Sequence, residues 1–124
     1  MRHFILSLAL SLFATGSAWA QTLKSPDGNL VLDFHLSGTE TPVYSLDYKG
    51  KPIIKESKMG FVLHPDYQFN QDFEIVDTKF AESDTTWETV WGQNKEIRDN
   101  HKEMFVALRQ KKTGWLLNIR FRLF

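Results

Sequence analysis

The sequence predicts an all-β protein, an antiparallel β-sandwich, in the residues that follow an N-terminal leader. Three observations support this fold class. Apolar residues after residue 20 recur with a period of two, as in strands with one buried face. Groups of proline, glycine, aspartate and asparagine separate these runs and are typical of turns. No stretch after the leader has the apolar period of an amphipathic helix of ordinary length.

The first strand is expected directly after a turn at residues 25–29, Ser-Pro-Asp-Gly-Asn, because proline presets φ and glycine tolerates a positive φ. The runs that alternate, or that are rich in aromatic and β-branched residues, predict strands in chain order. They are residues 30–36, 44–48, 52–54, 61–63, 73–80 and 86–91.

The clearest hairpin is predicted near the C-terminus. Residues 104–110 alternate, residues 111–114 (Lys-Lys-Thr-Gly) form a turn, and the apolar residues of 115–123 then fall on one face. The sequence stops inside this alternation. Because an edge strand leaves backbone groups unpaired, we expect the sandwich to be incomplete at the C-terminus.

The leader, residues 1–20, is typical of a secretory signal peptide. Arg2 and His3 precede an apolar run over residues 4–14, and Ala18-Trp19-Ala20 has the pattern of a cleavage site. We expect cleavage after Ala20 and a periplasmic or secreted mature chain with no membrane attachment. The apolar run is short for a permanent membrane span. A membrane anchor or a buried helix is the alternative.

Composition excludes several classes of protein. The 124 residues suffice for one domain. The 15 basic and 15 acidic side chains balance, which argues against a nucleic-acid-binding protein. The absence of cysteine excludes a disulfide framework, a thiolate metal site and a cysteine nucleophile.

Catalytic and metal-binding motifs are also missing. There is no G-x-S-x-G, no H-E-x-x-H and no phosphate-binding loop. His35, His64 and His101 lack ligand spacing, and residues 66–72 lack the glycine and distal glutamate of a calcium loop. Glycoside hydrolysis needs two carboxylates, and spacing alone does not select a pair among 15. We therefore predict no catalytic residue and no metal ligand in this chain.

Residues 87–103 depart from the strand pattern and form the candidate site. They combine two tryptophans with an arginine and many polar side chains around Gly92. Such a mixture suits carbohydrate, because indole faces stack on sugar rings and polar groups bind hydroxyls. We expect residues 92–103 to be a loop that faces substrate or another domain. The candidate residues are Trp91, Gln93, Glu96, Arg98, Asp99 and Glu103.

A plainer interpretation of this segment remains open. Trp87 and Trp91 could be core residues of one strand, with residues 94–102 as a solvated loop held by its own turn bonds. In that case Arg98 would pair locally with Asp99 or Glu103.

Several segments resemble the opening of glycoside hydrolase family 97. In chain order they are residues 25–30 (SPDGNL), 42–46 (PVYSL), 48–54 (YKGKPII) and 57–60 (SKMG). A second group resembles a later part of that family's N-terminal domain: Trp87, residues 90–92 and 97–99, Glu103 and residues 117–122 (LNIRFR). Two positions depart from the family pattern. Gln93 stands where a glutamate is expected, and His101-Lys102 where Tyr-Asn is usual.

The resemblance implies an N-terminal sandwich of the galactose-mutarotase type, followed by a catalytic (β/α)8 barrel and a small C-terminal β domain. It implies a secreted bacterial α-glucosidase or α-galactosidase that acts on oligo- or polysaccharides. The catalytic carboxylates and calcium-binding glutamates of the family lie beyond Phe124. Calcium is therefore implied for the full-length enzyme and no cofactor for this chain, which we expect to be inactive alone. The alternative is a free-standing β-sandwich that binds carbohydrate or is structural.

Overall fold

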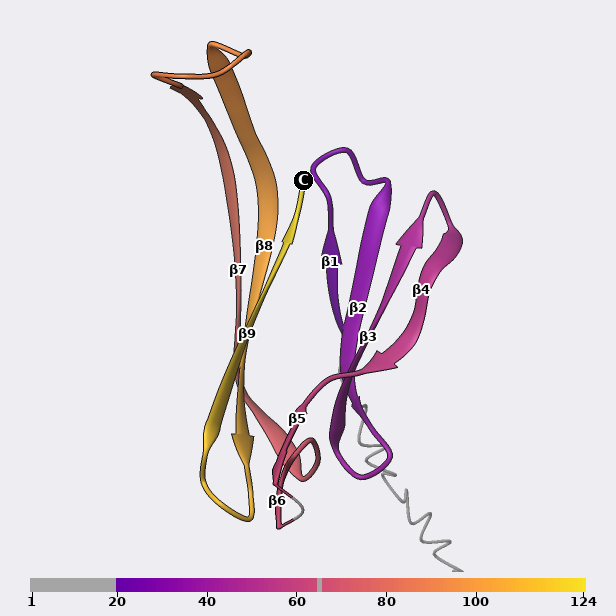
Figure 1. Cartoon of the computed structure of the whole chain (residues 1–124). Coiled ribbons are helices and arrows are strands. Elements are labelled where there is room, and N and C mark those ends of the chain that lie inside the picture. The colour runs from indigo at the N-terminus through magenta and orange to yellow at the C-terminus, as the bar shows by residue number, and fades with distance from the viewer. Residues whose placement is uncertain (1–19, 65) are drawn as a thin grey trace, which may run out of the picture.

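The computed structural model describes residues 20–64 and 66–124, which are built from antiparallel strands and contain no helix (Figure 1). The strands are β1 (Gln21–Lys24), β2 (Leu30–Ser37), β3 (Thr41–Tyr48), β4 (Lys51–Lys58), β5 (Phe61–His64), β6 (Tyr67–Phe69), β7 (Phe73–Glu88), β8 (Glu96–Gln110) and β9 (Leu116–Leu123). In this part of the chain no helix is long and apolar enough to cross a membrane. The predicted leader lies outside the described residues except for Ala20.

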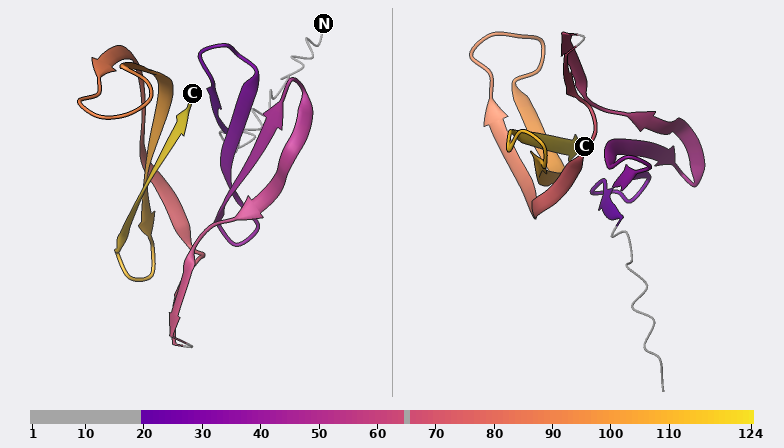
Figure 2. Two further views of the ribbon diagram at one scale, coloured as in Figure 1. Left: turned by 45° about the horizontal axis from the view of Figure 1, so that its top comes forward. Right: turned by 90° about the horizontal axis from the view of Figure 1, so that it is seen from below.

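The strands form two main sheets and a small hairpin. One sheet has the order β1-β2-β3-β4, the second has the order β7-β8-β9, and β5 pairs with β6. Every pairing is antiparallel. The two sheets lie side by side with their inner faces together, and the β5–β6 hairpin lies at one end where the chain crosses between them (Figures 1 and 2). The predicted antiparallel β-sandwich is confirmed.

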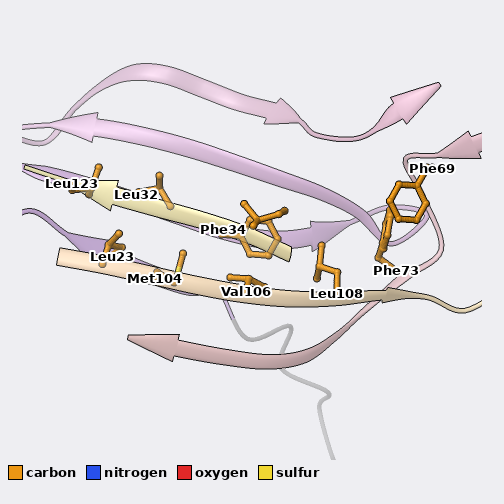
Figure 3. Close-up of a cluster of buried hydrophobic side chains, with 10 residues drawn as sticks. Leu23, Leu32, Phe34, Phe69, Phe73, Met104, Val106, Leu108 and Leu123 are labelled. Atoms are coloured by element: carbon orange, nitrogen blue, oxygen red, sulfur yellow. The ribbon is translucent and has the colours of Figure 1, made fainter. Parts of the chain in front are cut away.

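The core fills the space between the sheets (Figure 3). Its buried side chains are Leu23, Leu32, Phe34, Phe69, Phe73, Met104, Val106, Leu108, Ile119 and Leu123. The rings of Phe34 on β2 and Phe121 on β9 join the two sheets, with their centroids 5.7 Å apart. Burial of each large apolar side chain stabilises the fold by roughly 1.5 to 3 kcal/mol. The alternating residues of β2, β8 and β9 therefore hold the sandwich together.

The turns form where the sequence predicts them. In the first, the Asp27 carboxylate accepts hydrogen bonds from the Ser25 hydroxyl at 2.5 Å and from the backbone N–H of Asn29 at 3.0 Å. These bonds hold the pKa of Asp27 below its ordinary value. In the β8–β9 turn, Gly114 has a φ of 74° and its N–H donates to the carbonyl of Gln110 at 2.8 Å. Only glycine adopts this φ without strain.

One hairpin projects beyond the sandwich. Strand β9 pairs with β8 only between Lys102 and Arg109, whereas β7 and β8 remain paired as far as Glu88 and Glu96. Residues 83–101 therefore form a two-stranded arm, which is seen above the sandwich in Figure 1. Two expectations are corrected here. Residues 73–80 and 86–88 belong to one 16-residue strand, and most of residues 92–103 lie in β8 and not in a loop.

Candidate functional site on the β7–β8 arm

The tip of the arm is a short turn, residues 89–95, that presents apolar side chains to solvent. Thr89 closes the turn, since its N–H donates to the carbonyl of Lys95 at 2.9 Å and its hydroxyl donates to the carbonyl of Asn94 at 2.6 Å. Val90 and Trp91 are 88% and 89% exposed. A fully exposed indole on a closed turn has no role in the fold of the described chain.

The two faces of the arm carry different chemistry, which follows from the register. Arg98 pairs with Thr86 and shares its face with the core residues of β8, so it lies on the inner face toward the other sheet. Asp99 is the next residue and therefore lies on the outer face. Trp87 and Ile97, a directly opposed pair, lie on that outer face and are 53% and 38% exposed.

Arg98 is held by a carboxylate of the opposite strand. Its Nε donates to Asp84 Oδ1 at 2.8 Å and its Nη2 donates to Asp84 Oδ2 at 2.7 Å. This bidentate bond lowers the pKa of Asp84 and raises that of Arg98. The alternative interpretation, in which Arg98 pairs locally with Asp99 or Glu103, is wrong. Those two residues lie on the other face of β8.

The outer face has its own polar bonds near the base of the arm. Asp99 contacts the ring of His101, which is buried and packs against Phe124 with centroids 5.3 Å apart. Glu103 accepts a hydrogen bond from Arg122 Nε on β9 at 2.6 Å. This bond lowers the pKa of Glu103. The outer charged groups are thus already paired within the chain.

The remaining candidate residues lie at or next to the tip. Trp91 and Gln93 lie in the turn, and Glu96 begins β8 directly opposite Glu88. Two like charges in opposed positions weaken a strand pair. The candidate residues therefore separate into three groups: the tip, the inner-face Arg98 and the outer-face carboxylates. They do not converge on one pocket.

The alternative interpretation of this segment is also wrong in part. Trp87 and Trp91 are not core residues of one strand, because both are exposed and only Trp87 belongs to β7. The loop prediction failed because residues 96–100 of β8 have no apolar face on the core. A strand shows apolar alternation where one of its faces packs on a core, and these residues project beyond the core of the sandwich.

Asp84, the partner of Arg98, was not among the predicted site residues. It lies 14 positions before Arg98, and no local motif connects the two. The signal is the register of the hairpin, in which Asp84 is the diagonal neighbour of Arg98.

The described residues do not fit a metal site. Among residues 20–64 and 66–124, no three His, Asp or Glu side chains gather closely enough to hold a metal ion.

The described chain is an antiparallel β-sandwich from which a two-stranded arm with an exposed aromatic tip projects. A model of the glycosyl-hydrolase 97 N-terminal family matches residues 23–124. The chain belongs to this family.

Solved structures agree with this assignment. The chain is similar to a glycoside hydrolase family 97 enzyme from Pseudoalteromonas sp. strain K8, solved in complex with panose and with acarbose, at 30% sequence identity and a TM-score of 0.77. The match covers 84% of this chain and 16% of the enzyme. A β-arabinopyranosidase shares the fold, at 21% identity and a TM-score of 0.72 over 83% of this chain and 16% of that protein. The described chain thus corresponds to a small part of each relative.

Proposed function

We propose that this chain is the N-terminal β-sandwich part of an exported α-glycosidase that acts on α-glucosides or α-galactosides. The chain supplies no catalytic residue and supports a catalytic (β/α)8 barrel. The single observation that carries the proposal is the family match over residues 23–124, in a chain that spans only 16% of a family 97 enzyme. The remaining length of such an enzyme is where the catalytic groups belong.

The arm is the surface that suits this partner. Its tip presents Val90 and Trp91, the two most exposed of the large apolar side chains in the described residues, next to each other, where a partner surface could bury both. Arg98, Asp99 and Glu103 are bonded within the chain, so the apolar tip and not these charges is available for docking. We infer that the tip packs on the catalytic barrel and helps to shape the sugar site.

A similar enzyme supports the proposed substrate class. The similar Pseudoalteromonas enzyme was solved with panose and with acarbose. Export is part of the same proposal and depends on the leader with its cleavage site after Ala20. A secreted or periplasmic location fits an enzyme of oligo- and polysaccharides.

Hydrolysis assays on two proteins test the proposal. The exported gene product, by which we mean the whole protein that the gene encodes, should hydrolyse an aryl α-glucoside or α-galactoside. Residues 21–124 alone should show no turnover with or without calcium. Turnover by the short chain above a heat-denatured control would contradict its supporting role. Failure of the gene product on both substrate classes would reject the α-glycosidase assignment.

The second candidate is a free-standing β-sandwich that binds carbohydrate or is structural. The exposed aromatic side chains of the arm support this module as well as they support the enzyme part, since indoles bind sugars as well as proteins. The reading frame downstream of Phe124 separates the two: several hundred further codons support the enzyme, and a stop codon supports the module.

A further inference from the structure

A second surface feature lies at the end of the sandwich opposite the arm. The β5–β6 hairpin and the β8–β9 turn lie at this end (Figure 1). Residues of both line a pocket of about 370 Å³. This volume falls within the range of about 300 to 1,000 Å³ that small-molecule sites occupy. The pocket shares no residue with the arm.

An aromatic column fixes one wall of the pocket. Phe73 is fully buried, and Phe69 packs edge-to-face on it with centroids 5.0 Å apart (Figure 3). Phe69 in turn packs on Trp115, with centroids 5.9 Å apart. Trp115 is nevertheless 48% exposed. The indole is held by the core and still presents half of its surface, so a ligand that stacks on it orders no flexible side chain.

A buried side-chain amide, that of Gln110, holds together the two segments that line the pocket. Gln110 is 2% exposed, and its Nε2 donates to the carbonyls of Gln68 at 3.0 Å and Gln71 at 3.1 Å. Its Oε1 accepts a bond from the Thr113 hydroxyl at 2.7 Å. This one side chain therefore clamps the β5–β6 region to the β8–β9 turn. The pocket is preformed.

The rim carries polar side chains that the fold does not use. Within the described residues, the side chains of Gln71, Asp72 and Lys112 make no hydrogen bond, although all three line the pocket. Tyr67 adds a second aromatic ring at the rim and is 57% exposed. Two aromatic rings with an amide, a carboxylate and an ammonium group can stack on a sugar ring and bind its hydroxyls.

We propose that this pocket binds a short oligosaccharide, with Trp115 as the stacking platform and Gln71 as a hydroxyl ligand. The lining holds two carboxylates, Asp66 and Asp72, against one ammonium group, Lys112, which disfavours an anionic ligand, and the two aromatic rings suit a neutral polyol. We take the oligosaccharide to be a segment of an α-glucan, a choice that rests on the proposed function. The site itself is a second sugar contact, remote from the arm, that would hold a polymer on the protein.

Native electrophoresis of the exported gene product in gels that contain amylopectin tests the site, with gels that contain no polysaccharide as reference. Trp115→Ala should weaken amylopectin binding about tenfold, the scale of a stacked aromatic anchor. Gln71→Ala should weaken it about threefold, as expected for one hydrogen bond to a hydroxyl. Because no bond of the fold involves the Gln71 side chain, this variant keeps the test valid if Trp115→Ala folds poorly. Tyr48→Ala, which removes an exposed aromatic side chain on β3, should bind as the parent does.

The outcomes separate this site from the proposed function. Retardation that is unchanged in both Trp115→Ala and Gln71→Ala overturns the sugar site, whatever the glycosidase activity. Weakened retardation in a gene product that hydrolyses no aryl α-glycoside supports the site and counts against the enzyme. A gel with β-glucan that retards the parent as strongly as amylopectin overturns the assignment of an α-glucan.

Discussion

Trp91 offers the most direct test of docking by the arm, and we predict that Trp91→Ala destabilises the exported gene product. The indole is 89% exposed in the described chain. If it remained in solvent, its removal would change the free energy of unfolding by no more than about 0.5 kcal/mol. A large effect can therefore come only from a partner surface that covers it.

The size of the effect follows from the area that docking would bury. An aromatic side chain buries at least about 150 Å² at an interface. At about 25 cal/mol per Å², this burial contributes about 4 kcal/mol, and alanine retains only a small part of it. We therefore expect Trp91→Ala to lower the free energy of docking by about 3 kcal/mol, which corresponds to more than a hundredfold weaker docking.

Limited proteolysis and urea unfolding measure this loss. Trp91→Ala should expose the arm to protease and lower the urea midpoint, while Tyr48→Ala, which removes an exposed side chain of the sandwich, should change neither. Equal midpoints and equal cleavage rates for the parent and for Trp91→Ala would refute the reasoning and return the tip to solvent.

Four further predictions concern the sandwich and the leader. Met104→Ala should lower the free energy of unfolding by about 2 to 5 kcal/mol in urea titrations, because Met104 is fully buried and the change leaves a cavity. The hydrogen bond from Arg122 lowers the pKa of Glu103 in the folded protein. The stability that this bond contributes is therefore complete above the ordinary carboxyl pKa of about 4.3, and it is lost as the pH falls through the lower pKa of the folded protein. Glu103→Gln should therefore reduce the change of melting temperature across the acid range, and an unchanged acid profile would contradict the pairing. Intact mass of the exported protein should place its N-terminus at Gln21, and a retained leader would contradict export. Residues 21–124 alone should associate or unfold without cooperativity, because β9 has a free edge and many large apolar side chains are exposed, and a monodisperse, cooperatively unfolding monomer would disprove this.

Local sequence patterns were enough to predict the strands and turns of the sandwich. Alternation in residues 30–36 and 117–123 predicted strands, because each has one face on a core. The β8–β9 turn was equally predictable, since Gly114 occupies a position that requires a positive φ. The antiparallel sandwich follows from these elements, and the family resemblance rests on the same segments.

The candidate site depends on tertiary contacts that local patterns do not predict. Arg98 lies among polar residues with no alternation, so the sequence predicted a loop, whereas the register places it in a strand and against Asp84. Trp115 is a second example. The sequence places it on the apolar face of residues 115–123, whereas the structure shows its ring packed on Phe69 at the rim of a pocket. The physical reason is common to both. Strand formation is a local preference that the pattern records, whereas partner choice depends on which residues the register and the packing of two sheets bring together.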